Sequence, residues 1–265
     1  MLKDITIGQY FPGQSIIHRL DPRFKIIMTI LLIIMLFAAD SFLSMALCVI
    51  FVAAAYILTK LPAKLMWKSL KPVVPILVFT AVINIFFYDG DVIFRLGFLK
   101  ITDDGLKNAM FMLLRIILLI IGTSVLTYTT SPIALTDAIE RLMSPLKKLK
   151  VPVHELAMMM TIALRFIPTL IEETDKIIAA QKARGADFES GNLIARVKAM
   201  IPILIPLFIS AFKRAEELAL AMECRCYNGG EGRTRLRQLK IRPGDFSALF
   251  ICCLSLAAVI VLNII

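Results

Sequence analysis

The stretch that decides the fold is Leu106–Thr130, which reads LKNAMFMLLRIILLIIGTSVLTYTT. A helix rises about 1.5 Å per residue, so a helix of this length is long enough to cross the roughly 30 Å of hydrocarbon in a bilayer. Only Lys107 and Arg115 carry a charge in it. The stretch therefore predicts a transmembrane helix.

Four other apolar runs have a comparable length and character, and Pro72 and Pro75 break the third of these four near its start. They lie at Phe24–Ala39, Ser41–Leu58, Pro72–Tyr88 and Phe246–Ile265. We therefore expect an all-α integral membrane protein with about five transmembrane helices. The N-terminal membrane domain, residues 1–130, would hold four spans, at 24–39, 41–58, 72–88 and 106–130, and residues 246–265 would form the C-terminal transmembrane helix.

The composition excludes an ordinary soluble protein. Of the 265 residues, 58% are hydrophobic and 19% are charged, and the mean hydropathy is +0.81. A soluble domain averages about 45–50% apolar residues even when glycine is counted. However, the 30 Lys and Arg against 20 Asp and Glu give a net charge of +10. These charges are too many for a chain made only of spans, so part of it must lie outside the bilayer.

The basic residues predict the orientation, because cytoplasmic loops carry an excess of Lys and Arg. They gather before the first run and between the second and third, at Lys3, Arg19, Arg23, Lys25, Lys60, Lys64, Lys68 and Lys71. We expect a cytoplasmic N-terminus and a cytoplasmic domain of long amphipathic helices at residues 131–245. The alternative is that Pro152–Ile171 or Ala199–Phe212 also crosses. The basic run Arg233–Arg242 is better explained by anionic membrane lipid than by nucleic acid.

No familiar catalytic constellation is present. The sequence contains no P-loop, no H-E-x-x-H and no G-x-S-x-G. Cys224 and Cys226 form a C-x-C without a second ligand pair, so we expect no metal site. The acidic pairs Glu172–Glu173 and Glu216–Glu217 are expected on wet helix faces, with Lys176 and Lys213 as neighbours on the same helices. A membrane-embedded enzyme, either a protease or a lipid-modifying protein, remains the alternative from another class.

Two segments share a plan in which a helix ends in a small residue, an arginine and another small residue. The triplets are Ala183-Arg184-Gly185 and Cys224-Arg225-Cys226, and glycine follows or closes each one. One interpretation is that a cation is simply favoured in the last turn of a helix. The other is that small flanking residues leave the planar guanidinium able to reach a carboxylate or carbonyl of another protein.

Other residues have two interpretations each. Met158, Met159 and Met160 offer either core packing or an adaptable apolar surface for a partner. Arg115 faces either the interior of the bundle or the outer surface. Asp21-Pro22 is a good helix start, with Asp as the N-cap and Pro in the first turn. The cations beside it either pair with lipid phosphates or have a structural role.

Two further stretches resemble the T component of energy-coupling factor transporters. One is Pro12–Lys25, reading PGQSIIHRLDPRFK, and the other runs from Leu164-Arg165-Phe166-Ile167-Pro168-Thr169-Leu170 to Ala183-Arg184-Gly185. The resemblance covers nearly the whole chain. In that family the second arginine triplet is commonly Ala-Arg-Gly, and here cysteine flanks Arg225 on both sides.

The resemblance implies a non-catalytic coupling subunit of an ABC-type importer in the cell membrane. Its partners would be two ABC-type ATPase subunits and a small membrane-embedded S component that captures a vitamin or similar micronutrient. The triplets Ala183-Arg184-Gly185 and Cys224-Arg225-Cys226 would dock on the ATPases, and Met158, Met159 and Met160 would contact the S component. The chain would bind no cofactor, because ATP and Mg²⁺ are used by the ATPases. A dedicated cobalt or nickel T component is the nearest alternative.

Overall fold

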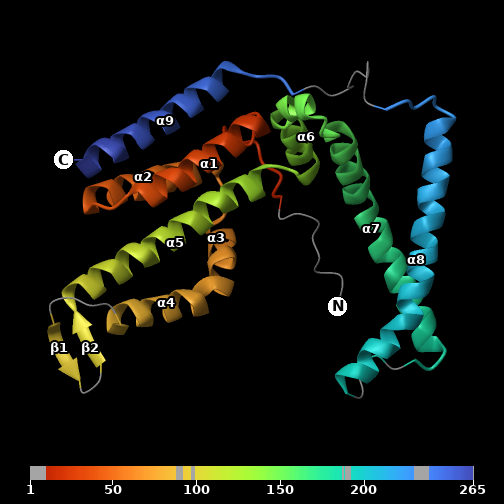
Figure 1. Ribbon diagram of the computed structural model, residues 1–265, viewed down its shortest axis with the longest axis horizontal. Coiled ribbons are helices and arrows are strands. Elements are labelled where there is room, and N and C mark those ends of the chain that lie inside the picture. The colour runs from red at the N-terminus through yellow and green to blue at the C-terminus, as the bar shows by residue number, and fades with distance from the viewer. Residues whose placement is uncertain are drawn as a thin grey trace. The chain divides into compact units, whose positions relative to one another are not determined.

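The computed structural model describes residues 10–87, 92–96, 99–186, 188, 192–229 and 239–264 (Figure 1). The elements are, in order, α1 (Pro22–Ala38), α2 (Phe42–Thr59), α3 (Ala63–Leu70), the 3-10 helix η1 (Lys71–Val73), α4 (Val74–Phe87), β1 (Val92–Leu96), β2 (Leu99–Thr102), α5 (Asp103–Thr129), α6 (Pro132–Leu142), the 3-10 helix η2 (Ser144–Leu149), α7 (Val153–Ala183), α8 (Leu193–Glu223) and α9 (Pro243–Ile264). Lys3, Tyr88 and most of the basic run Arg233–Arg242 lie outside the described residues.

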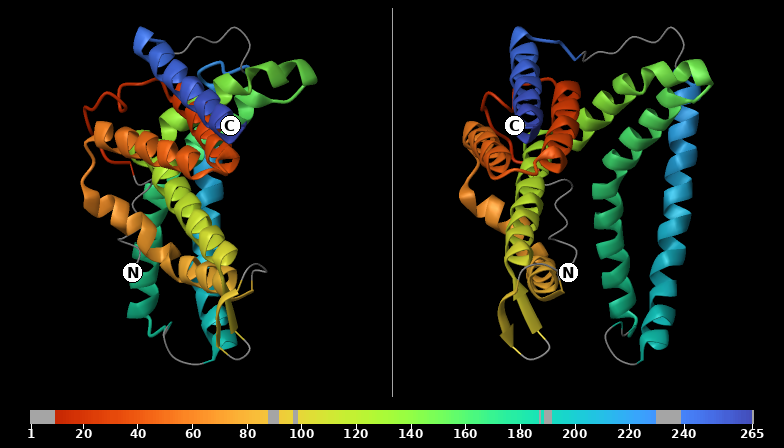
Figure 2. Two further views of the ribbon diagram at one scale, coloured as in Figure 1. Left: turned by 90° about the vertical axis from the view of Figure 1, so that its left-hand side faces the viewer. Right: turned by 60° about the vertical axis from the view of Figure 1, so that its left-hand side comes forward.

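The chain divides into two compact units. The described residues of Gln9–Leu135 and Gln238–Ile265 form the first, which we call the bundle unit. Those of Thr136–Arg237 form the second, which we call the long-helix unit. In the bundle unit α1, α2, α5 and α9 pack side by side, while α3 and α4 pack on α5 (Figures 1 and 2).

The core of the bundle unit lies where α1, α2, α5 and α9 meet. Met35, Leu36, Cys48 and Val259 are completely buried there, and Leu118 of α5 joins the same cluster. Gly122 of α5 brings α1 close, because a Cβ at this position would lie 2.3 Å from Cδ2 of Leu32. Close packing of this kind holds helices together in lipid, where tails and side chains are equally apolar.

The start of α1 follows the sequence prediction. Asp21 is the N-cap, its carboxylate accepts the backbone N–H of Arg23 at 2.9 Å, and Pro22 stands in the first turn. The side chain of Arg23 also donates to both carboxylate oxygens of Asp21, at 3.0 and 2.7 Å. The backbone N–H of Asp21 donates to the buried carboxylate of Asp245 at 2.8 Å, which ties α1 to α9.

The segment before α1 is held by its own side chains. His18 bonds the Ser15 hydroxyl through Nδ1 at 2.6 Å and the carbonyl of Phe11 through Nε2 at 3.0 Å. A Cβ on Gly13 would lie 2.8 Å from the His18 ring, so a larger residue does not fit there without displacing the ring. The backbone N–H of Phe11 reaches the carbonyl of Tyr128 in α5. These contacts give the segment Phe11–His18 a structural role.

The prediction of an all-α membrane protein is confirmed. Five helical segments of the described chain are long and apolar enough to cross a membrane, namely α2, the bent segment Ala63–Phe86, α5, α7 and α9. Pro72 lies in the 3-10 turn η1 that bends Ala63–Phe86, as its position predicted. A short antiparallel hairpin, β1–β2, was not predicted.

The five candidate membrane-spanning segments differ from the five predicted spans at two helices. α1 has 17 residues, at the lower limit for crossing hydrocarbon, and is not among the five. α7 has 31 residues and is among them, so the alternative in which Pro152–Ile171 crosses stays open. Length and composition alone do not decide which helices span, and the domain boundaries 1–130, 131–245 and 246–265 remain predictions.

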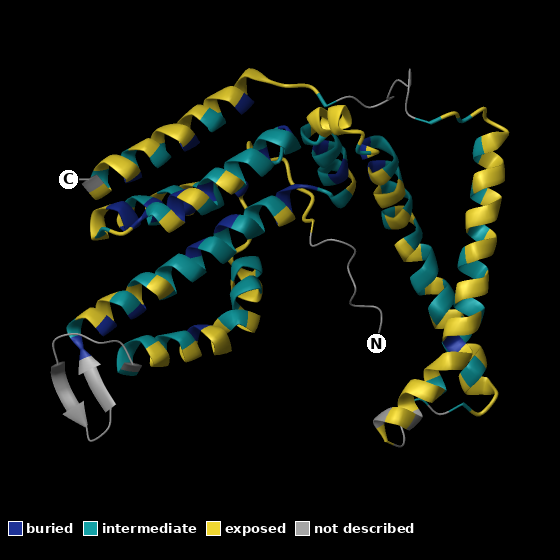
Figure 3. Cartoon of the chain, in the orientation of Figure 1, coloured by how far each residue is buried: buried dark blue, intermediate teal, exposed yellow. Residues whose placement is uncertain are grey.

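The long-helix unit is dominated by α7 and α8, each of 31 residues. They pack on each other as an antiparallel hairpin (Figure 2). Pro168 lies inside α7, and Pro202 and Pro206 lie inside α8. Exposed residues run along most of α8 (Figure 3). Among the described residues of this unit, the buried apolar side chains are few, namely Ala138, Val153, Ala157 and Ile203.

Candidate functional site

The end of α7 forms a Schellman motif. The backbone N–H of Gly185 donates to the carbonyl of Lys182, and that of Ala186 donates to the carbonyl of Gln181, both at 3.0 Å. Gly185 has a φ of +86°, the left-handed conformation that this motif requires and that glycine adopts without strain. Arg184 is the capping residue, and its side chain is exposed.

The end of α8 repeats this arrangement. The N–H of Cys226 donates to the carbonyl of Glu223 at 2.8 Å, and that of Tyr227 donates to the carbonyl of Met222 at 3.1 Å. Cys226 occupies the left-handed position with a φ of 53°. Arg225 immediately precedes it, as Arg184 precedes Gly185. The two arginines therefore occupy the same place in the same capping motif.

Neither guanidinium has a partner within the part of the chain that the structure describes. Arg184 and Arg225 are both exposed, as are the small residues Ala183, Cys224 and Cys226 beside them. A cation at the end of a helix is favoured by the helix dipole alone. The structure adds that the planar forks of both side chains are available to carboxylate or carbonyl groups of another protein.

Polar contacts fix how α7 and α8 cross. Glu173 of α7 accepts hydrogen bonds from Arg214 at 2.9 Å and from the Ser210 hydroxyl, and Gln181 donates to the carbonyl of Pro202 at 3.2 Å. The charge of Lys176 acts on Glu173, as its position on the same helix predicted, but the hydrogen bonds of the carboxylate go across to α8. Glu216 and Glu217 are exposed, as the sequence predicted, and Lys213 on the same helix is exposed as well.

The Glu173–Arg214 contact lies midway between the two helix ends. Glu173 precedes Arg184 by 11 residues, and Arg214 precedes Arg225 by 11 residues. Because the two helices are antiparallel, the arginines lie at opposite ends of the hairpin. Their separation is on the order of 30 Å from the rise per residue. One binding groove does not span this distance, so two separate grooves would be needed.

An extended apolar surface accompanies these ends. Met159 and Met160 of α7 are exposed, and Met158 is half-buried. Sequence reasoning missed a larger stripe on α8 with helical spacing, which we call the α8 stripe. It consists of Val197, Ile201, Leu204, Ile205, Phe208 and Phe212, all exposed. The signal was present as steps of three and four residues, which place side chains on one face of a helix.

Arg115 reaches the turn between α1 and α2. It donates to the carbonyl of Ala39 at 2.8 Å and pairs with Asp40 at 3.2 Å, while its guanidinium lies over the ring of Phe37. Its Nε is buried without a hydrogen-bond partner in the described structure. The side chain thus extends toward the helix end and fastens α5 to that turn. This placement favours the interpretation in which Arg115 extends toward the outer surface over the one in which it faces the interior of the bundle.

Metal ligands do not gather in the described residues, where no group of three or more His, Cys, Asp or Glu side chains is placed to hold an ion. Cys224 and Cys226 are both exposed.

Comparison with known proteins agrees with the resemblance. A family model described as cobalt transport protein, CbiQ, matches residues 13–236. A protein of Ruminiclostridium cellulolyticum is 58% identical over 245 residues, which is 92% of each chain. One of Clostridium kluyveri is 54% identical over 265 residues, covering 99% of this chain and 98% of its own, and one of Bacillus subtilis is 49% identical over 261 residues, or 98% of each.

All three relatives are named energy-coupling factor transporter transmembrane protein EcfT. Transmembrane components of such transporters are non-catalytic subunits, so the alternative of a membrane-embedded enzyme is set aside. The matched length, the identity and the apolar helices together lead to one conclusion: the chain belongs to the family of transmembrane T components of energy-coupling factor transporters.

Proposed function

We propose that the chain couples two ABC-type ATPase subunits to a membrane-embedded S component that captures a vitamin or similar micronutrient. Ala183-Arg184-Gly185 would dock on one ATPase and Cys224-Arg225-Cys226 on the other. The ATPases bind and hydrolyse ATP with Mg²⁺, while this chain holds no nucleotide. The complex lies in the cell membrane, with the N-terminus of this chain in the cytoplasm, as the basic loops predict.

The observation that carries the proposal is the matched geometry of the two helix ends. Each presents an exposed arginine as the residue before the left-handed position of a Schellman motif. A docking helix needs this combination, because a firm last turn fixes the direction of the side chain and small neighbours admit the wall of a groove. Their placement at opposite ends of the hairpin suits two ATPase subunits rather than one.

The mechanism is mechanical. ATP binding draws the two ATPases together and moves the helix ends that are docked in them. The α7–α8 hairpin transmits this motion because Glu173, Ser210 and Arg214 link its two helices. The S component would rest on Met158, Met159, Met160 and the α8 stripe, an apolar surface that polarizable methionine and aromatic side chains make adaptable. Its reorientation would then release the substrate inside the cell.

The test is the double variant Arg184→Ala/Arg225→Ala in the assembled complex. Each lost guanidinium removes charge-assisted hydrogen bonds of about 1.5–3 kcal/mol, so the ATPases should no longer co-purify and ATP-driven uptake should cease. Arg141→Ala is the matched control, because Arg141 is also an exposed arginine in the last turn of a helix of the same unit. Full uptake by the double variant contradicts the docking role.

A cobalt or nickel cargo is the second candidate, and the description of the matching family model favours it. The mechanism within this chain would be the same, because the cargo is bound by another subunit. Identification of the small membrane protein that co-purifies with the chain, followed by uptake of labelled vitamin or labelled cobalt, distinguishes the two. Uptake of the metal with no vitamin uptake would overturn the vitamin proposal.

A further inference from the structure

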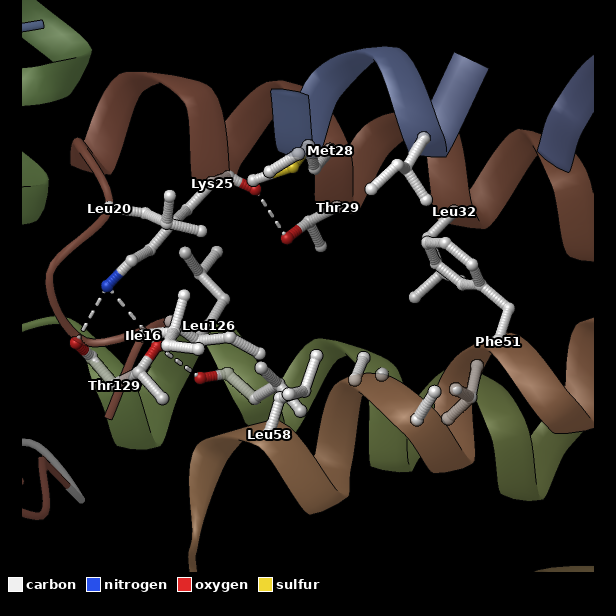
Figure 4. A pocket seen from close by; sticks show the side chains of 18 of the residues that line it. Ile16, Leu20, Lys25, Met28, Thr29, Leu32, Phe51, Leu58, Leu126 and Thr129 are labelled. Carbon is white, nitrogen blue, oxygen red and sulfur yellow. Dashed lines mark hydrogen bonds between the residues drawn. The ribbon is translucent and has the colours of Figure 1, made fainter. Parts of the chain in front are cut away.

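An apolar pocket of about 360 Å³ lies within the bundle unit (Figure 4). Its walls come from α1, α2, α5 and α9 and from the segment just before α1. Small residues leave the space open, namely Ala54, Ala55, Gly122, Gly244 and Ala248. The volume is at the lower end of the roughly 300–1,000 Å³ of small-ligand pockets. The pocket therefore suits one hydrocarbon chain and is too small for a complete two-chain lipid.

The hydroxyl groups in the wall of the pocket donate hydrogen bonds to backbone carbonyls of their own helices. The Thr29 hydroxyl donates to the carbonyl of Lys25, that of Thr129 to the carbonyl of Val125, and that of Ser247 to the carbonyl of Gly244. The surface that they leave to an occupant is almost entirely apolar. Lys25 is the only charged residue among those that line the pocket.

Lys25 stands at one end of the pocket, beside Leu20 and Thr129 (Figure 4). It is buried, and its ammonium donates to the carbonyl of Thr129 at 3.0 Å. Its other contacts are long, at 3.3 Å to the Thr130 hydroxyl, 3.4 Å to the Thr129 hydroxyl and 3.5 Å to the carbonyl of His18. No carboxylate among the described residues forms an ion pair with it. The carboxylates of Asp245 and Asp21 act on its charge without an ion pair. Because three of its four contacts are long, the ammonium can exchange them for a nearer anionic oxygen.

The pocket also has the orientation that a bilayer lipid requires. Lys25 lies in the first turn of α1, and Thr129 is the last residue of α5, so the charged end is where helices leave the hydrocarbon. From Lys25 to Leu32, which also lines the pocket, α1 advances by about 10 Å into the bundle. The pocket is partly open at the surface, where exposed Ala54 and Leu58 of α2 form its edge.

From this arrangement we propose that the pocket is a binding site for an anionic membrane phospholipid, with one acyl chain between α1, α2 and α5 and the phosphate beside the Lys25 ammonium. The occupant comes from the surrounding bilayer, because the open side of the pocket lies on helices that are long and apolar enough to span it. Charge complementarity selects an anionic headgroup over a zwitterionic one.

The test uses the full chain in vesicles of phosphatidylcholine doped with phosphatidylglycerol that carries a photoreactive group on one acyl chain. Mass spectrometry then locates the cross-links. Wild-type protein should be labelled at pocket residues such as Phe51, Val52 and Leu126. A phosphatidylcholine probe with the same acyl chain should label them less. Equal labelling by the two probes would overturn the proposal.

Variants of Lys25 test whether the headgroup of the lipid, rather than its acyl chain, contributes to binding. Lys25→Met should lower labelling by the anionic probe roughly tenfold, the factor that corresponds to losing one charge-assisted hydrogen bond. Lys25→Arg should retain most of it. Lys107→Met is the control for charge, because Lys107 lies at the other end of α5 and does not line the pocket. Labelling unchanged in Lys25→Met contradicts the role of the ammonium.

Ala55→Phe tests the acyl chain independently, because the ring would fill the pocket from α2. Labelling by both probes should fall, and the thermal unfolding midpoint shows whether the variant is folded. If Lys25→Met does not fold, two results still test the proposal. They are the difference between the two probes on wild-type protein and the loss of labelling in Ala55→Phe. Persistent labelling of the pocket in Ala55→Phe would overturn the site. Absence of pocket labelling by either probe in wild-type protein would also overturn the site, because the pocket would then admit no acyl chain from the bilayer.

Discussion

The bundle unit and the long-helix unit are stabilised in different ways. The bundle has a buried cluster around Met35 and Leu36, and the Asp21–Asp245 contact joins helices that are distant in sequence. The long-helix unit has few buried residues, and α7 and α8 are joined by Glu173, Arg214 and a small number of further polar contacts. The bundle therefore contains its own stabilising contacts, while the hairpin leaves its two arginine ends and the α8 stripe exposed.

The largest effect is expected in the bundle. Asp245 is completely buried, and its carboxylate accepts the backbone N–H groups of Asp21 at 2.8 Å and Arg242 at 2.6 Å. Asp245→Ala should lower the free energy of unfolding by about 2–4 kcal/mol, because it leaves buried donors without an acceptor. Asp245→Asn retains one acceptor and should lose less. Thermal unfolding in detergent measures both, and equal losses would contradict this account of the contact.

A smaller effect on stability is expected at the C-terminal ends of α7 and α8, with opposite signs at the two ends. Gly185 has a φ of +86°, with nothing within 4 Å of the position of a Cβ, so Gly185→Ala introduces backbone strain without a clash. It should destabilise the end of α7 by about 1 kcal/mol. Cys226→Gly should stabilise the end of α8 by a similar amount, since cysteine there already carries this strain. Hydrogen exchange of the last turns measures both. The same sign of effect in both variants would be the contradicting result.

The smallest effect on stability should come from Glu173. Its ion pair with Arg214 is partly exposed, with side-chain exposures of 24% and 35%, and such pairs contribute about 0.2–1 kcal/mol. Glu173→Ala should leave the unfolding midpoint of the bundle unchanged but speed hydrogen exchange where α7 and α8 meet. Glu172→Ala is the matched control on the adjacent position. A loss of bundle stability in Glu173→Ala would remove the distinction between the units.

Sequence reasoning predicted the elements that depend on local chemistry. Apolar runs located the long helices of the bundle, Asp21-Pro22 located the start of α1, and small-Arg-small triplets located the ends of α7 and α8. It did not predict that Cys226 takes the left-handed position of Gly185. Backbone conformation at a helix end depends on the hydrogen bonds of the residues that follow, and cysteine carries no signal for it.

The remaining features depend on tertiary packing. The partner of Glu173 lies on another helix, and spacing within α7 indicates only neighbours such as Lys176. Most of the α8 stripe lies within Ala199–Phe212, which the sequence analysis described only as a stretch that could cross the membrane. Which of its side chains stay exposed depends on how α7 packs against α8. Lys25 was recognised as a cation near the membrane surface, but its burial against Thr129 requires the meeting of α1 and α5.

The midpoint position of the Glu173–Arg214 contact has a mechanical consequence. When two crossed rods turn about a common pivot, points at equal distances from the pivot move through equal arcs, even when the points lie at opposite ends. Arg184 and Arg225 each lie 11 residues beyond this contact, on different helices and at opposite ends of the hairpin. If the proposed docking holds, a rotation there would move both ATPases by the same distance and divide the force evenly, so neither ATPase would gain leverage over the other.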